Sequence, residues 1–244
     1  QWGISREAQD EIALASHRNL AAAYERGFFD NLITPYRGLT RDQNLRPDTS
    51  AEKLASLKPV FGKNLTTAEP SMTAGNSTPL SDGAATVLLG SRAWARAHDL
   101  PALATVVDVE TAAVDFVSGK DGLLMSPAFA VPRLLARNGM KLDDFDFIEI
   151  HEAFASTVLT ILAAWEDDEF GRTRLGLPGA FGTVDRAKLN VTGSSLAAGH
   201  PFAATGARIV ATLATLLAEK GSGRGLISIC AAGGQGVAMI LEAA

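Results

Sequence analysis

The sequence predicts an α/β layered fold in which a mixed sheet is flanked by helices. Three observations predict it. From residue 83 onward, apolar segments of strand length alternate with helical patterns, and this order is typical of α/β layers. The last two apolar segments are joined by a glycine-rich link, as in a hairpin. Hydrophobic residues make up 47% and charged residues 20% of the 244 residues, so the chain can bury a sizeable core.

The N-terminal region begins with a helical pattern and continues as an irregular one. Ser5 is placed to cap an amphipathic helix that ends at Gly27. Residues 28–64 contain three prolines and lack periodicity, so we expect a loop-rich region. Within it, Thr49-Ser50-Ala51-Glu52 has the spacing of a capping box and predicts a short helix.

Two strands and a helix are predicted before residue 115. They are a buried strand over Gly83–Gly90, a helix from Ser91 to His98, and a β-branched strand over Ala102–Val114.

The middle of the chain predicts a helix, a strand and a second helix. The Ser126-Pro127 pair starts a helix that runs to Arg137 with a bend at Pro132. A strand over 145–150 then feeds directly into a helix that begins near Ala153.

The C-terminal region predicts a helix followed by a hairpin. The helix covers Thr205–Lys220 and ends at Gly221. The hairpin pairs Gly225–Cys230 with Val237–Glu242.

Composition narrows the class of partner. The formal charge of −5 and the lack of a basic block argue against nucleic acid or an anionic membrane. We expect no transmembrane segment, because no uninterrupted apolar run approaches roughly 18 residues. A single cysteine excludes an internal disulfide framework and fits a reducing, cytoplasmic compartment. Spacing typical of metal ligands is not present, so we expect no metal.

The first polar cluster is Ile150-His151-Glu152-Ala153-Phe154, where a strand turns into a helix. Sites in α/β proteins gather at such strand ends. His151 there can donate a hydrogen bond or hold a water molecule. Taken alone, a structural histidine is the more frequent explanation of such a turn.

The second cluster runs from Gly193 to Arg208 and contains Gly199-His200-Pro201. Small residues on both sides let a ligand or backbone approach the His200 ring closely, and Pro201 stiffens the turn. A histidine so placed can take a proton from a thiol. The alternative is a glycine-rich helix start with an incidental histidine.

The third cluster is Cys230-Ala231-Ala232-Gly233-Gly234-Gln235-Gly236, at the end of an apolar strand. A free cysteine on such a strand is usually a small core residue. The glycine-rich backbone after it, however, can present N–H groups to an oxyanion. A thiol can also serve as acid and base when its environment tunes it.

These three clusters, together with Thr73-Ala74-Gly75-Asn76-Ser77-Thr78-Pro79-Leu80-Ser81-Asp82-Gly83-Ala84-Ala85, resemble the thiolase family along essentially the whole chain. The resemblance implies the layered α-β-α-β-α thiolase fold and an acyltransferase that uses coenzyme A (CoA) as substrate, without a cofactor. His200 would activate the nucleophilic cysteine and bind the thioester oxygen, and Cys230 would move the α-proton. The remaining implied contacts are the Ala232 amide in an oxyanion hole and Thr78, Gly199, Gly233 and Phe154 at the substrate, with Thr78 at the pantetheine arm.

The first cluster suggests a subgroup. The commonest family motif begins with Asn, whereas His151 stands here, and this variant resembles thiolase subunits of fatty-acid β-oxidation complexes. The insert over residues 170–178 is similar to theirs. His151 would then hold the water of the first oxyanion hole or bond the ligand directly. A homodimer or higher oligomer and a β-oxidation α subunit are the partners implied.

The resemblance also predicts the domain organisation. Residues 1–75 would be part of the loop domain, 76–99 the tail end of a truncated N-terminal domain, and 100–244 the C-terminal domain. The nucleophile would lie in the missing N-terminal part, so we expect these residues alone to be inactive. A truncated domain should leave an unpaired apolar sheet edge that favours association.

Three other functions stay open. A decarboxylating ketoacyl synthase also uses cysteine with two histidines, but needs no second thiol at Cys230. A biosynthetic acetoacetyl-CoA thiolase uses the same groups in the direction of condensation. A non-catalytic interaction fragment is the third. Arg172, Arg174 and Arg208 could meet CoA phosphates, although solvated surface arginines are more frequent. The thiolase interpretation requires that His200 and Cys230 face one acyl group.

Overall fold

The computed structural model describes residues 2–62, 64 and 69–244. The chain forms two compact units, each assembled from separate stretches of sequence. The first unit contains the residues up to Asp82 with Ile150–Phe181 and Asn190–Pro201, and the second contains Gly83–Glu149, Gly182–Leu189 and Phe202–Ala244.

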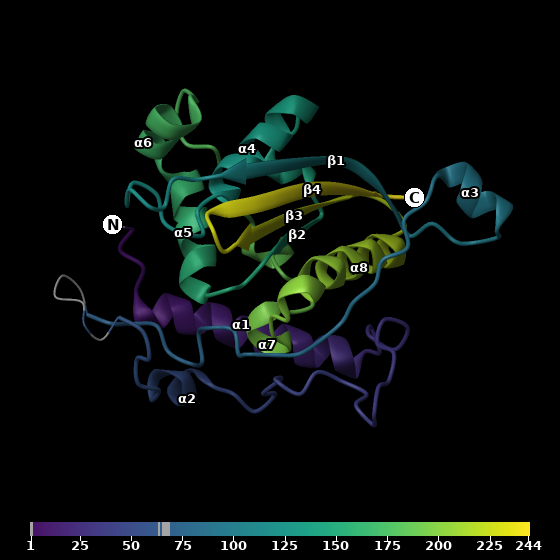
Figure 1. Ribbon diagram of the computed structural model, residues 1–244, viewed down its shortest axis with the longest axis horizontal. Coiled ribbons are helices and arrows are strands. Elements are labelled where there is room, and N and C mark those ends of the chain that lie inside the picture. The colour runs from purple at the N-terminus through teal and green to yellow at the C-terminus, as the bar shows by residue number, and fades with distance from the viewer. Residues whose placement is uncertain (1, 63, 65–68) are drawn as a thin grey trace. The chain divides into compact units, whose positions relative to one another are not determined.

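The first unit is helical and is built around α1 (Arg6–Glu25, purple in Figure 1). Ser5 caps this helix as predicted, because its Oγ accepts a hydrogen bond of 3.1 Å from the Ala8 N–H. Ala13 and Leu14 on the buried face of α1 pack in one apolar cluster with three other segments. The other elements of this unit are α2 (Ala51–Ala55), α5 (Ala155–Glu166), α6 (Asp168–Phe170), a π-helical turn η2 (Gly171–Leu175) and α7 (Ser195–Ala198).

The short helix α2 is present, but its cap is one residue later than the capping-box spacing predicts. Ser50, not Thr49, is the N-cap, and its Oγ accepts a hydrogen bond of 3.2 Å from the Lys53 N–H. Ser50 has the extended backbone that a cap requires, with φ −141° and ψ 166°. Thr and Ser are both favourable N-cap residues, and only the backbone decides between them.

The second unit contains a four-stranded sheet in the order β1-β4-β3-β2. Its strands are β1 (Ala104–Ala113), β2 (Phe147–Ile150), β3 (Arg224–Ala231) and β4 (Gln235–Ala243), of which β2 runs on at Ile150 into the first unit. The predicted hairpin is confirmed: β3 and β4 are antiparallel and lie between β1 and β2 (yellow in Figure 1). Strand β4 also pairs antiparallel with β1.

Two helices cover the sheet, α4 (Pro127–Asn138) and α8 (Phe202–Lys220). Leu213 and Leu217 of α8 pack with Ile227 and Leu241 of the hairpin. The α4 side is marked by Gly236, where a Cβ would lie 2.6 Å from Ser126 Oγ at the start of α4. Because side chains alternate along a strand, α4 and α8 contact opposite faces of the sheet. The remaining elements are α3 (Arg92–Ala97), capped by Ser91 as predicted, and the 3₁₀ turns η1 (Leu142–Asp144) and η3 (Arg186–Lys188).

Helix α8 passes a length and composition test for a membrane-spanning helix, although the sequence predicts no such segment. It has 19 residues and a mean hydropathy of 1.3, so by length and composition it could cross a membrane. The sequence contains no uninterrupted apolar run there, because threonines and small residues are interspersed. The packing of its leucines on the hairpin accounts for its apolar residues without a membrane.

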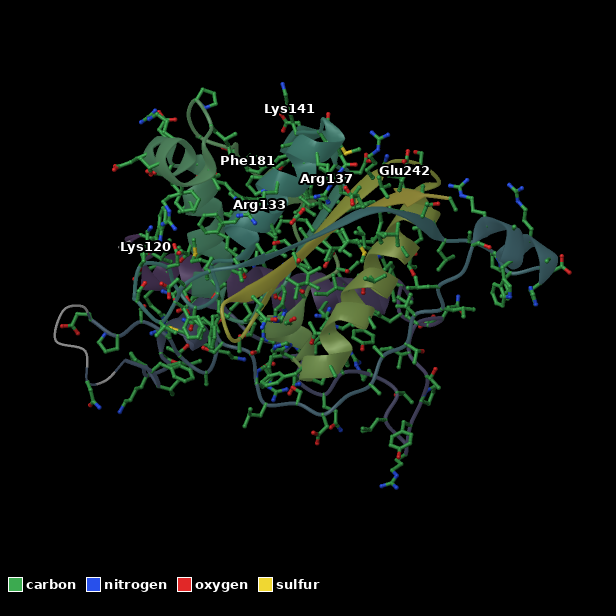
Figure 2. The ribbon with its side chains drawn as sticks, turned by 45° about the horizontal axis from the view of Figure 1, so that its top comes forward. Lys120, Arg133, Arg137, Lys141, Phe181 and Glu242 are labelled. Carbon is green, nitrogen blue, oxygen red and sulfur yellow. The ribbon has the colours of Figure 1, made fainter. Side chains whose placement is uncertain are left out.

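Helix α4 is joined to the edge of the sheet by ion pairs. Arg137 lies near the end of this helix and is labelled in Figure 2. Its Nε donates to Asp108 Oδ2 at 2.8 Å, and its Nη1 donates to Glu110. Its Nη2 also donates to the Val109 carbonyl at 2.9 Å. Hydrogen bonding from Arg137 holds the pKa of the Asp108 carboxyl well below its usual range. The helix runs through Pro132 and ends at Gly139 in the left-handed conformation.

The predicted strand over Gly83–Gly90 is wrong. These residues have no regular secondary structure, and the side chains of Leu88 and Leu89 are 73% and 71% exposed. An apolar run becomes a strand only where a neighbouring strand accepts its hydrogen bonds, and in the described part of the second unit none does so for these residues. Valine side chains of β1, an edge strand of that sheet, are about 40% exposed, but association through an apolar edge stays a prediction.

Candidate active site

The turn that carries His151 is held by the side chain of Asn190. Its Oδ1 accepts from the Ile150 N–H at 2.9 Å, and its Nδ2 donates to the Ile150 carbonyl at 2.9 Å. The same Nδ2 donates to Glu152 Oε1 at 2.7 Å. Asn190 itself adopts φ +47°, a left-handed conformation that asparagine tolerates better than most residues. One amide thus fixes the residues on both sides of His151.

The Glu152 carboxylate is buried and binds three separate segments. Its Oε2 accepts from Ser16 Oγ of α1 at 2.7 Å and from the Leu196 N–H of α7 at 3.1 Å. Its Oε1 accepts from Asn190. Ser16 Oγ also accepts from the Ser194 N–H at 3.1 Å. A buried carboxylate requires such donors, and here they join α1, the Asn190 turn and α7.

His151 and His200 lie side by side. Their ring centroids are 4.2 Å apart and the rings are tilted by 51°. His151 is 1% exposed, and its Nδ1 is 2.8 Å from Ser195 Oγ. His200 follows α7 and Gly199 and is partly exposed. The structure therefore brings together the first two clusters predicted from the sequence, and the pair can offer imidazole donors and acceptors to one small region.

Position 199 requires glycine for two reasons, its backbone conformation and the lack of space for a side chain. It has φ +103°, and a Cβ at this position would lie 2.4 Å from Ser81 Oγ and 2.6 Å from Asn44 Nδ2. Asn44 Nδ2 donates to Ser81 Oγ at 3.0 Å and to the Ala198 carbonyl at 3.3 Å. These contacts hold the backbone that immediately precedes His200.

Thr78 and Phe154 lie in the same unit, on two paired segments. The Thr78 N–H and Oγ1 both donate to the Ala153 carbonyl at 3.1 Å, and Ser77 forms a bridge with Phe154. The Phe154 ring meets the Phe61 ring edge-on, with centroids 5.9 Å apart. Thr78 therefore braces the turn after His151, and its contact with a pantetheine arm stays a prediction.

Cys230 lies in the second unit, near the end of β3. It pairs with Gly236 of β4 and is 4% exposed. Directly paired residues share a face, so Cys230 is on the α4 side of the sheet. Burial raises the pKa of the Cys230 thiol to about 12. The sulfur is therefore a neutral thiol at neutral pH, as a proton donor must be.

The turn after β3 is formed by Ala232, Gly233 and Gly234. The two glycines have φ +89° and +75°, which only glycine adopts readily. The Gly234 carbonyl accepts from the Val114 N–H at 2.8 Å, which ties the turn to the segment after β1. Ala232 and Gly233 are exposed. Their role at an oxyanion and the convergence of Cys230 with His200 stay predictions.

Sequence reasoning missed the residues that support the two histidines. Ser16, Glu152, Asn190 and Ser195 are separated by up to 179 positions, and no short motif joins them. Glu152 and Ser195 lie in the first and second clusters but had no role assigned, and Ser16 and Asn190 lie outside all three clusters. Of the arginines considered for CoA phosphates, exposed Arg172 pairs with Asp168 at 3.4 Å, and Arg174 lies over the Phe170 ring. Among the described residues, His, Cys, Asp and Glu form no group of three that could hold a metal ion.

Two family models match the chain. The model of the thiolase C-terminal domain matches residues 100–243, and that of the thiolase N-terminal domain matches residues 1–93. The 3-ketoacyl-CoA thiolase of Pectobacterium carotovorum subsp. carotovorum (strain PC1) is 44% identical over 99% of the chain and 55% of its own length. That of Yersinia pestis (strain Pestoides F) is 43% identical with the same coverage. The chain thus spans about half the length of the curated relatives it matches.

Solved structures show the same likeness. The acetyl-CoA acetyltransferase of Bacillus anthracis superposes with a TM-score of 0.79 at 38% identity, over 100% of this chain and 57% of its own. The dimeric peroxisomal thiolase of Saccharomyces cerevisiae gives 0.80 at 34%, over 99% and 56%. Human mitochondrial 3-ketoacyl-CoA thiolase in complex with CoA gives 0.77 at 30%, over 99% and 55%. The predicted thiolase fold is therefore confirmed, and the chain belongs to the thiolase family.

Proposed function

We propose that the protein containing these residues cleaves 3-oxoacyl-CoA with CoA, and yields acetyl-CoA and an acyl-CoA shortened by two carbons. The observation that carries this proposal is the His151–His200 pair, supported by a buried hydrogen-bond network in a member of the thiolase family. The relatives named 3-ketoacyl-CoA thiolase and the human relative in complex with CoA support the same substrate class.

The reaction begins with a cysteine thiol outside these residues. His200 takes its proton, and the sulfur attacks the C3 carbonyl carbon of the substrate. The C2–C3 bond breaks, and its electron pair passes to C2 as the enolate of acetyl-CoA. The neutral thiol of Cys230 protonates C2, so acetyl-CoA leaves. The thiol of a second CoA gives its proton to the Cys230 thiolate and attacks the acyl-enzyme. The shortened acyl-CoA is released, and the nucleophilic cysteine recovers its proton from His200.

Two oxyanion holes assist these steps. His151, directly or through a water molecule, and His200 would donate to the thioester oxygen of the enolate. The Ala232 amide would donate to the oxyanion formed at C3, and Gly233 allows the backbone to turn there. Each donor removed should raise the barrier by about 3 to 4 kcal/mol, as in other acyl-transfer enzymes.

The placement of the nucleophile is tested with two proteins. The only cysteine in the 244 residues, Cys230, has the second role in this mechanism, so these residues alone should not cleave acetoacetyl-CoA. The full-length protein should do so, and Cys230→Ala should abolish its turnover while CoA still binds. Thiolysis by the 244-residue polypeptide, or full activity of Cys230→Ala, would contradict the mechanism.

The physiological setting is part of the proposal. We infer degradation of fatty acids by β-oxidation in the cytoplasm, in a homodimer or higher oligomer that can bind an α subunit. The His151 variant of the motif and the dimeric yeast relative support this inference. The alternative is a biosynthetic acetoacetyl-CoA thiolase, which the Bacillus anthracis acetyltransferase favours. Steady-state kinetics with acyl chains of increasing length separate them, because only the degradative enzyme should prefer long chains.

A further inference from the structure

We propose that Ser195 is a positioning residue that sets the tautomer of His151. Its hydroxyl donates a hydrogen bond to Nδ1 of His151 and thereby holds the ring proton on Nε2. The Nε2–H is then the donor offered to the substrate oxygen or its water. The significance of this donor rests on the proposed function, but the tautomer itself can be measured without it.

The contact between these two residues is short and fully buried. Ser195 Oγ lies 2.8 Å from His151 Nδ1. Ser195 is 0% exposed and His151 is 1% exposed, so bulk water does not compete for this nitrogen. In such a site a hydrogen bond is stronger than at the surface. The loss of either partner leaves the other polar atom buried without this hydrogen bond, which destabilises the folded protein.

The backbone around the two residues keeps them at this distance. Ser195 is the first residue of α7, and the next residue, Leu196, donates its N–H to Glu152 Oε2 at 3.1 Å. The residue before it, Ser194, donates its N–H to Ser16 Oγ at 3.1 Å. The dipeptide His151-Glu152 is therefore bonded to α7 at two successive positions. The backbone of Ser195 is thus held by neighbours on both sides.

The chemistry decides the direction of the hydrogen bond. A neutral imidazole has one N–H donor and one acceptor nitrogen, and the partner of one nitrogen determines the state of the other. If Ser195 accepted a hydrogen bond from Nδ1–H, then Nε2 would carry a lone pair and would repel an oxyanion. If Ser195 donates, Nε2 carries the proton and stabilises the oxyanion. Only the second arrangement supports catalysis.

The first measurement is nuclear magnetic resonance of the full-length protein labelled with ¹⁵N-histidine, without substrate. His151→Asn identifies the His151 signals by their loss. We expect the wild type to show one His151 tautomer with the proton on Nε2, and Ser195→Ala to shift a large share of it to Nδ1. Ser195→Thr, which keeps the hydroxyl, should retain the wild-type tautomer. A wild-type proton on Nδ1, or an unchanged tautomer in folded Ser195→Ala, would overturn the proposal.

Ser194→Ala is the matched control. Ser194 is also 0% exposed, and within the described residues its Oγ has no hydrogen-bond partner, so its removal should leave the tautomer and turnover unchanged. In the thiolysis assay Ser195→Ala should lower kcat about tenfold with little change in KM, because the donor acts on the transition state. A tautomer change without loss of kcat would confirm the positioning and contradict the proposed role of His151. The same loss in Ser194→Ala would count against both.

Discussion

The imidazole rings of His151 and His200 lie in contact, with centroids 4.2 Å apart. If His200 is the base and His151 the donor, their replacement should have unequal effects. His200→Asn removes the base and should lower kcat about 10³-fold to 10⁴-fold. His151→Asn keeps an N–H donor and should lower kcat by no more than about 10²-fold. Thiolysis of acetoacetyl-CoA by the full-length protein measures both.

The control for this pair is His98→Asn, since His98 is exposed at the end of α3 and bonds only local groups. Its turnover should equal that of the wild type. If His151→Asn were more damaging than His200→Asn, the assignment of the two roles would have to be reversed.

The Glu152 carboxylate should be needed for stability, because three donors point at it. In Glu152→Gln an amide N–H₂ replaces one acceptor oxygen and faces a donor, so we expect a loss of about 1 to 3 kcal/mol in the free energy of unfolding. Urea denaturation measures this loss. Exposed Glu166→Gln is the matched control and should be nearly neutral. Equal stabilities of the two variants would show that the hydrogen bonds to Glu152 contribute nothing to the free energy of unfolding.

Gly199→Ala should destabilise the protein for two reasons, a positive φ and a collision with Ser81 and Asn44. The conformational strain alone costs on the order of 1 kcal/mol, and the collision adds to it. Gly221→Ala separates the two effects, since Gly221 has φ +75° and open space around it. Thermal denaturation should therefore show a larger drop in Tm for Gly199→Ala. Similar Tm values would mean that the Ser81 side chain moves away from the added methyl group at little cost in free energy.

The sequence was sufficient to predict the elements that are determined by residues close together in the chain. Ser5 caps α1, Gly221 ends α8, and the glycines after Cys230 turn the hairpin, and each of these depends on residues within a few positions. The strand expected over Gly83–Gly90 failed because a strand requires a partner, which local pattern does not reveal.

The candidate site was likewise predictable only where its residues lie in short motifs. His151 and His200 could be singled out because each lies in a short polar or small-residue motif. Their support could not, because Ser16 and Asn190 reach Glu152 only through the packing of α1 and the turn after residue 189. Which hydroxyl meets which carboxylate is decided by tertiary structure and leaves no periodic signal.

Cys230 should resist alkylation in the folded state. Its pKa is raised to about 12 by burial, and only the thiolate reacts, so iodoacetamide at about pH 8 should modify it very slowly. The 244-residue polypeptide is suited to this test because it contains no other cysteine. Mass spectrometry should show rapid modification once urea unfolds the chain. Rapid modification without urea would mean that the sulfur is exposed or ionised.

His17 should lower the free energy of unfolding in mild acid. Burial and the nearby charge of Arg46 lower the pKa of His17 from 6.5 to about 4. Between these values the unfolded chain binds a proton that the folded chain does not, so this group makes the free energy of unfolding fall as the pH falls from about 6.5 to about 4. His17→Gln removes the proton site and keeps an acceptor for the Arg46 N–H, which His17 Nδ1 accepts at 3.2 Å. Urea denaturation at about pH 7 and about pH 5 should show a smaller loss for His17→Gln than for the wild type. His98→Gln is the control and should lose as much stability as the wild type, and an equal loss in all three proteins would exclude His17 as the cause.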